Sequence, residues 1–103
     1  EGDVKFSYKR LEPSISRFIK ILQIDLDRLH QHRTNIHKFR KNKEFELLDK
    51  EQVNASRTCQ QLKSNIRQLE QTRSRLEDDA LEKFDEKTSD IRMQAITSAV
   101  EFL

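Results

Sequence analysis

The fold is decided by residues 45–80, which read FELLDKEQVNASRTCQQLKSNIRQLEQTRSRLEDDA. Apolar and small side chains recur along this stretch at alternating intervals of three and four residues, a spacing that gathers them on one side of a helix. The resulting seam consists of Phe45, Leu48, Gln52, Ala55, Cys59, Leu62, Ile66, Leu69, Arg73, Leu76 and Ala80. Such a narrow stripe is typical of a helix in a bundle or coiled coil, and not of a helix that is buried all round.

A similar periodicity runs through the first third of the chain, with one interruption. Two series at helical spacing follow each other, the second shifted by one residue: Leu11, Ile15, Phe18 and Leu22, then Leu26, Leu29, Arg33 and Ile36. The shift lies near Asp25 and predicts either a bend or a new helix that Asp25 caps. Because proline is tolerated in the first turn of a helix but not deep inside one, Pro13 predicts a start near Glu12.

Two turns divide the predicted helices. Asn42 is a good N-cap, so the first turn is expected near residues 41–43. For the second turn the sequence leaves two candidates: a cap at Asp78 or Asp79, and a later turn at residues 88–90, which we favour. The expected helices therefore cover about residues 11–40, 43–86 and 89–103 of one domain that spans residues 1–103.

Three antiparallel helices joined by short turns form an up-down-up bundle, so the predicted fold class is all-α. The alternative is one continuous helix through Asn42, which would make the chain a generic dimeric coiled-coil scaffold. The apolar stripe of the third helix is still running at Phe102 and Leu103, which predicts that this helix is truncated. We expect a second copy of the chain to cover the apolar surface that a truncated helix leaves open.

The composition excludes several classes of protein. The 103 residues include one Gly and one Pro, too few for the turns of a β-sandwich or for a glycine-rich phosphate loop. Cys59 stands alone, so no internal disulfide can form, which fits a reducing compartment. No segment approaches the roughly 20 apolar residues of a membrane span, and no signal-peptide pattern opens the sequence.

Charge is distributed unevenly along the chain. Residues 1–43 carry 11 Lys and Arg against 5 Asp and Glu, whereas residues 44–103 carry 9 against 13. We favour the interpretation that oppositely charged helices pack together. A basic arm that binds RNA or anionic lipid is the weaker alternative, because the net charge of the chain is only +2. That alternative predicts binding through residues 1–43 that falls steeply with salt.

The sequence groups no residues for catalysis, metal binding or cofactor binding. His30 and His37 share a helix face but lie two turns apart, too far for one metal ion, and His32 points elsewhere. All three are expected to be solvated. Cys59 falls in the seam and is expected to be buried and inert. Since the aromatic residues also fall mostly on seam positions, we expect no enzyme, metal, cofactor or nucleic-acid ligand.

One surface feature favours a protein partner. Six uncharged polar residues follow each other at helical spacing, one position ahead of the seam: Asn54, Thr58, Gln61, Asn65, Gln68 and Thr72. In a chain that is 37% charged, short amides and hydroxyls leave room for an incoming helix to dock and form hydrogen bonds. This uncharged stripe is therefore a candidate docking groove, and the alternative is that it packs against the third helix of the same bundle.

Several segments together form a pattern that is known from one family. They are residues 10–13 (RLEP), 18–21 (FIKI) and 25–29 (DLDRL) in the first helix, 54–55, 57–58, 60–62 and 64–67 in the second, and 101–103 (EFL) in the third. The pattern resembles the N-terminal part of the syntaxins, a family of SNARE proteins, over nearly the whole chain. The resemblance implies a regulatory Habc domain of three antiparallel helices, without the SNARE motif and membrane anchor that follow it in the family.

The resemblance also implies partners and a place of action. It points to the autophagosomal branch of the family, in which the SNARE motif pairs with cognate SNAREs to fuse autophagosomes with lysosomes. The HOPS tethering complex is a second implied partner. The whole protein would then act at the cytoplasmic face of the autophagosome, the endoplasmic reticulum or related membranes. In some syntaxins the SNARE motif folds back between helices two and three, where the uncharged stripe would offer a groove.

Overall fold

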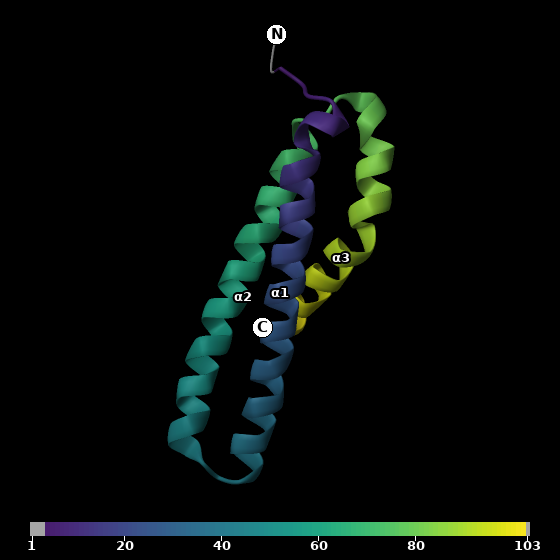
Figure 1. Cartoon of the computed structure of the whole chain (residues 1–103). Coiled ribbons are helices and arrows are strands. Elements are labelled where there is room, and N and C mark those ends of the chain that lie inside the picture. Colours follow the sequence, from purple (N-terminus) through teal and green to yellow (C-terminus); the bar gives the residue numbers. More distant parts are fainter. Residues whose placement is uncertain (1–3, 103) are drawn as a thin grey trace.

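The computed structural model describes residues 4–102. They form three long helices, α1 (Tyr8–Lys41), α2 (Phe45–Ser74) and α3 (Leu81–Phe102), with a single 3-10 turn, η1 (Asp78–Ala80), before α3. Helices α1 and α2 lie side by side and antiparallel, and α3 returns along them from the end where α1 begins (Figure 1). The expected all-α bundle of three helices is therefore confirmed.

Helix α1 begins earlier than Pro13 suggested. Ser7 is its N-cap, and the Ser7 hydroxyl accepts a hydrogen bond of 3.2 Å from the backbone N–H of Arg10. Pro13 then lies inside the helix. A proline at this position cannot donate to the carbonyl of Lys9. Since Lys9 and Pro13 are both exposed, that carbonyl lies on the solvent side of the helix, and the helix tolerates the proline.

Helix α1 also continues without a break through Asp25, so the predicted bend or new helix start is wrong. Asp25 is only 3% exposed and occupies the buried seam itself. With Asp25 included, the buried positions keep intervals of three and four and need no shift; they are Tyr8, Leu11, Ile15, Phe18, Leu22, Asp25 and Leu29. The apparent change of register in the sequence arises because a carboxylate, and not an apolar side chain, occupies this seam position.

The first turn lies where the sequence placed it, but Asn42 has the opposite role. Asn42 ends α1 as its C-cap, and Glu44 precedes α2 as its N-cap. Lys43 has a positive φ of 59°, and the backbone N–H groups of Glu44 and Lys43 donate to the carbonyls of Phe39 and Arg40 at 2.8 and 3.2 Å. This is a Schellman turn. It makes α1 and α2 a hairpin, which rules out one continuous helix through this point.

The second turn is the earlier of the two candidates, so the predicted helix of residues 43–86 is wrong. Helix α2 ends at Ser74 and α3 already begins at Leu81. The turn is fixed by the N-terminal segment: Phe6 N–H donates to Arg75 O at 2.8 Å, and Glu77 N–H donates to Phe6 O at 2.9 Å. Leu76 stays buried within this turn, which explains why the seam pattern continues past the end of the helix.

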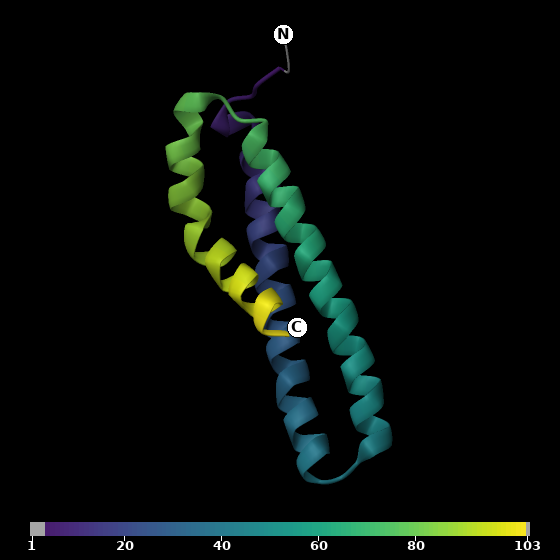
Figure 2. The same cartoon turned by 180° about the vertical axis from the view of Figure 1, so that it is seen from behind.

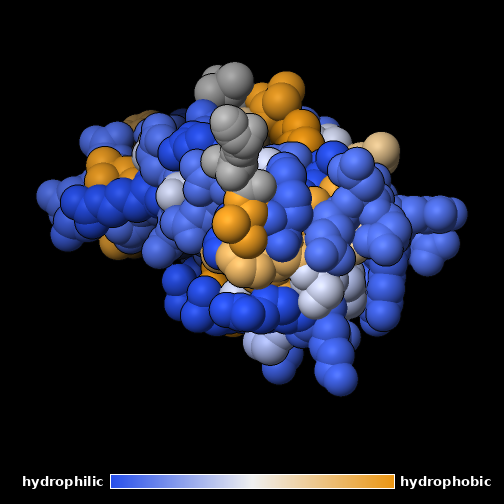
Figure 3. Space-filling model, turned by 90° about the horizontal axis from the view of Figure 1, so that it is seen from above, coloured by the Kyte–Doolittle hydropathy of each residue, from blue (hydrophilic) through white to orange (hydrophobic). Residues whose placement is uncertain are grey.

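The third helix is shorter than the other two. It has 22 residues, against 34 in α1 and 30 in α2, and the α1–α2 hairpin extends beyond it (Figure 2). Near the tip of the hairpin Phe45, a predicted seam residue, is 59% exposed, and Leu47 is 43% exposed. At the opposite end of the bundle the surface is mainly hydrophilic with separate apolar patches (Figure 3).

Candidate docking surface

The six residues of the uncharged stripe divide into two sets. Thr58 and Thr72 are 8% and 6% exposed, and Asn65 is half-buried. These three side chains alternate along α2 with three exposed ones, Asn54, Gln61 and Gln68. The stripe is therefore an inner row that contacts the bundle and an outer row of amides that faces solvent.

Thr58 of the inner row belongs to a polar cluster between α1 and α2. His32 Nδ1 lies 2.7 Å from Glu51 Oε2, and His32 Nε2 lies 3.0 Å from Thr58 Oγ1. Asn35 Nδ2 donates to the same Glu51 oxygen at 3.0 Å. The hydrogen bonds from His32 and Asn35 lower the pKa of Glu51 below its ordinary value. The side chain of His32 is only 19% exposed, so the expectation that it is solvated is wrong.

A second polar contact joins the same two helices. Asn65 Nδ2 donates to Asp25 Oδ2 at 2.7 Å. Asp25 and His32 are seven residues apart on α1, and Thr58 and Asn65 are seven apart on α2, so both contacts belong to one antiparallel register. Across the described residues, every buried side-chain nitrogen and oxygen has a hydrogen-bond partner. These contacts fix the pairing of α1 with α2, because a slip would leave buried polar groups unpaired.

Within the stripe, Thr58 and Asn65 thus contact α1, whereas the Thr72 hydroxyl donates to the carbonyl of Gln68 on its own helix at 2.9 Å. Helices α2 and α3 are joined instead by charged groups. Arg73 donates to both oxygens of Asp85 at 2.8 Å, while Arg92 bonds Glu70 at 2.8 Å and Asp85 at 3.1 Å. The hydrogen bonds from Arg73 lower the pKa of Asp85.

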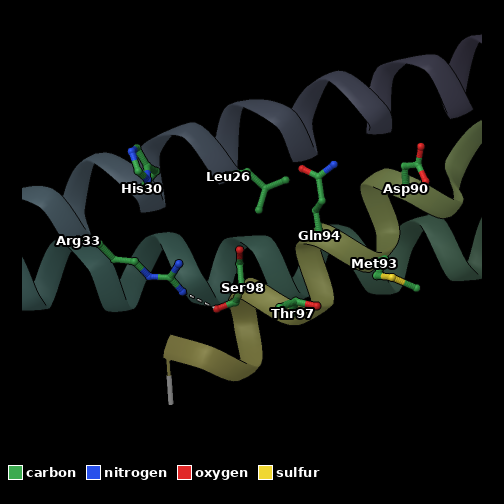
Figure 4. Close-up of a pocket in the computed structure, with 8 residues that line it drawn as sticks. All are labelled: Leu26, His30, Arg33, Asp90, Met93, Gln94, Thr97 and Ser98. Carbon is green, nitrogen blue, oxygen red and sulfur yellow. Dashed lines mark hydrogen bonds between the residues drawn. The ribbon is translucent and has the colours of Figure 1, made fainter.

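An open groove does lie between α1 and α3 (Figure 4). Arg33 Nη2 donates to the carbonyl of Ser98 at 2.9 Å, and this bond ties the helices together at one end of the groove. Leu26 and Gln94 project into the space between the two helices (Figure 4). The volume is about 470 Å³, and the lining residues are Leu26, His30, Arg33, Asp90, Met93, Gln94, Thr97 and Ser98.

Sequence reasoning missed this groove, because its residues come from two distant helices and share no periodic stripe. A second, shallower hollow of about 570 Å³ lies along α2 alone, lined by Asp49, Gln52, Val53, Ser56, Arg57 and Gln60. Cys59 is 2% exposed, as predicted. Within residues 4–102, no group of three or more His, Cys, Asp or Glu side chains is placed to hold a metal ion.

The family of the chain follows from comparison with known proteins. A family model described as "STX17-like, N-terminal domain" matches residues 9–103. The chain belongs to this family. Its membership agrees with the three-helix bundle and gives the chain a SNARE-related role, since the syntaxins are SNARE proteins.

Individual syntaxin-17 sequences match along the whole chain. The human and mouse proteins are each 38% identical to it over 104 residues, and the bovine protein is 36% identical; each match covers 100% of this chain. The chain spans about a third of the length of these relatives, 34% of the human protein and 35% of the mouse protein. No solved structure matches the syntaxin-17-like chain. None of its described helices has the length and apolar character that a membrane crossing requires.

Proposed function

We propose that this chain is the regulatory, protein-binding N-terminal domain of a syntaxin-17-like SNARE that acts in the fusion of autophagosomes with lysosomes. Its partners are the SNARE motif of the same protein, cognate SNAREs and the HOPS tethering complex. The whole protein acts at the cytoplasmic face of the autophagosome, the endoplasmic reticulum or related membranes. The observation that carries the proposal is the outer row of amides on α2, in a chain whose family is shown.

The outer row has the spacing that a docked helix needs. Asn54, Gln61 and Gln68 are seven residues apart, so each stands two turns from the next on one side of α2. Each amide carries two donors and an acceptor. A partner helix that lies along this row forms hydrogen bonds without burying a charge, which keeps the desolvation cost of docking low.

The inner row supports the outer one. Thr58 and Asn65 are held by His32 and Asp25 of α1, so the α2 surface that carries the amides has one orientation relative to α1. A surface fixed in this way loses less conformational entropy on binding than a flexible one. The α1–α2 hairpin therefore presents the row as a rigid docking edge.

The test is a charge change confined to the outer row. The triple variant Asn54→Glu, Gln61→Glu and Gln68→Glu keeps the inner row and its contacts with α1. We expect it to bind the matching SNARE motif or purified HOPS roughly 100-fold more weakly, because three sets of hydrogen bonds worth about 1 kcal/mol each are lost. Binding is measured by fluorescence anisotropy or surface plasmon resonance.

The matched control adds the same charge elsewhere on α2. Ser56, Gln60 and Gln71 are exposed and lie off the outer row, so Ser56→Glu, Gln60→Glu and Gln71→Glu should leave binding unchanged. Circular dichroism should report the same helicity for both variants. Full binding of both partners by the outer-row variant would remove these amides from the mechanism.

A further inference from the structure

The outer face of α1 carries a row of exposed cations. Arg10, Arg17, Lys20 and Arg28 follow each other at intervals of seven, three and eight residues, which places them on one side of the helix. All four are exposed; Arg17 and Lys20 point away from the buried seam of α1, and Arg28 lies at its edge, beside Asp25. At about 1.5 Å per residue the row is roughly 27 Å long. We call these four residues the basic row.

The basic row is not neutralised within the bundle. No member of it forms an ion pair with another residue in 4–102; of the exposed acids in the same stretch of α1, Glu12 lies off the row and Asp27 lies beside Lys20, which leaves four cations against one acid on this side. The ion pairs that the described residues do form are His32–Glu51, Arg33–Glu101, Arg73–Asp85, Arg92–Glu70 and Arg92–Asp85.

An apolar side chain lies within the row. Ile24 is 50% exposed and is four residues from both Lys20 and Arg28, so it stands between these two cations on the helix surface. Ile21 beside it is half-buried. Cations that flank an exposed isoleucine match the boundary between lipid headgroups and acyl chains, where charge stays in the polar layer and the apolar group reaches inward.

The shape of this face favours a flat partner. A helix docked on this row, unlike one docked on the uncharged outer row of α2, would bury cations at a desolvation cost, and the two hollows described above are lined by other residues. The basic row instead lies on the convex outer side of a single helix. Its long side chains can contact one flat surface at several points. A planar array of negative charge therefore fits the row better than a protein helix does.

We infer that the basic row is a contact surface for a membrane rich in anionic lipid, on which α1 lies with its outer face toward the headgroups. The contact is peripheral and electrostatic, with Ile24 reaching the headgroup boundary. Guanidinium and ammonium groups pair with the negative groups of the lipids, so the attraction falls off over the screening length of the salt. This surface is separate from the outer row of α2, and either one functions without the other.

The test measures sedimentation of the chain with vesicles. We expect it to bind phosphatidylcholine vesicles containing about one third phosphatidylserine, to bind pure phosphatidylcholine much more weakly, and to dissociate as salt is raised. The variant Arg17→Gln, Lys20→Gln and Arg28→Gln should bind the anionic vesicles roughly 100-fold more weakly, since each cation near the surface contributes about fivefold. Ile24→Ser should weaken binding by several-fold.

The control removes the same charge from another helix. Lys50, Arg57 and Arg67 are exposed on α2, and Lys50→Gln, Arg57→Gln and Arg67→Gln should retain vesicle binding to within about threefold. An equal loss of vesicle binding in the two triple variants would show that only the net charge of the chain matters, and would overturn the assignment of the row. Equal binding to neutral and anionic vesicles would overturn it as well, and so would binding to single-stranded RNA without binding to vesicles.

Discussion

Glu51 shows how one carboxylate holds two helices together. A single oxygen, Oε2, lies 2.7 Å from His32 Nδ1 and accepts from Asn35 Nδ2 at 3.0 Å. Both partners are on α1, three residues apart, and the carboxylate is on α2. Hydrogen bonds to the ionised form favour that form, which is why the pKa of Glu51 is lowered. The stability of the hairpin is therefore linked to the charge of this side chain.

This linkage predicts a loss of stability in acid. Because the pKa of folded Glu51 lies below its unfolded value of 4.5, its contribution is fully present above that value and is lost as the pH falls through the folded pKa. The free energy of unfolding of the parent should exceed that of Glu51→Gln at about pH 6, and the difference should shrink toward about pH 3. Urea titrations followed by circular dichroism measure both; a difference independent of pH would contradict the linkage.

The pair of Asp25 and Asn65 predicts a larger effect at the same scale. Asn65→Ala leaves a buried carboxylate without its donor, so we expect the free energy of unfolding to fall by about 2–4 kcal/mol. The exposed change Asn54→Ala is the control and should cost less than about 0.5 kcal/mol. If the double variant Asp25→Leu and Asn65→Leu restores the free energy of unfolding, the main role of the pair is to fix the register of α1 against α2. A mild effect of Asn65→Ala alone would show that Asp25 has another hydrogen-bond partner.

Asp25 also shows which contacts could not be predicted from the sequence. The apolar positions around it were identified correctly, but a carboxylate in the seam becomes tolerable only through Asn65, which is 40 residues away. His32 was missed for the same reason, since Glu51 and Thr58 lie on another helix. Periodicity identifies which face of a helix is buried, and it does not identify which polar groups meet there.

At the scale of the elements, the end of α2 depends on a segment outside the helices. The ring of Phe6 lies between two guanidinium groups, 5.2 Å from that of Arg10 and 5.1 Å from that of Arg75. Its backbone pairs with the turn after α2, and Lys5 Nζ donates to Ser74 O at 2.7 Å. The sequence predicted helix two to continue because Leu76 and Ala80 keep the spacing of the seam. No sequence pattern near the turn indicates that Phe6 pairs with it.

Removal of this ring should therefore loosen the turn. Phe6→Ala deletes the two cation–π contacts and a partly buried side chain, and we expect a loss of about 1–2 kcal/mol in the free energy of unfolding. Backbone amide exchange should accelerate at residues 75–80 more than within the two long helices. Val4→Ala is the control, since Val4 is 73% exposed and should change neither measurement. Uniform exchange across the chain would contradict a local role for Phe6.

At the scale of the whole molecule, the hairpin is longer than the helix that covers it. The extents of the molecule are 57 × 24 × 20 Å, and the tip of the hairpin lies beyond α3 (Figure 2). Exposed apolar residues near the tip include Phe45, at 59%, and Val53, at 51%. Helix α3 runs alongside the hairpin from Leu81 to Phe102.

We predict that this surface makes the chain self-associate as concentration rises. A second copy that covers Phe45 and Leu47 would remove apolar area from water, at about 25 cal/mol per Å². The mass measured by light scattering should therefore increase with concentration, and Phe45→Ser combined with Leu47→Ser should abolish the increase. A constant monomer mass for the parent at high concentration would contradict the prediction.

The pairing of Phe6 with the turn after α2 also determines how the molecule responds to mechanical load. Two backbone hydrogen bonds connect Phe6 to residues 75 and 77 in the turn after α2. A force applied to the chain ahead of residue 4 therefore loads these two bonds before it loads the first turn of α1. The tip at residues 42–44 has no such tether. When force is applied at its N-terminus, the domain should first lose these two hydrogen bonds, in a small extension that precedes unfolding of the α1–α2 hairpin.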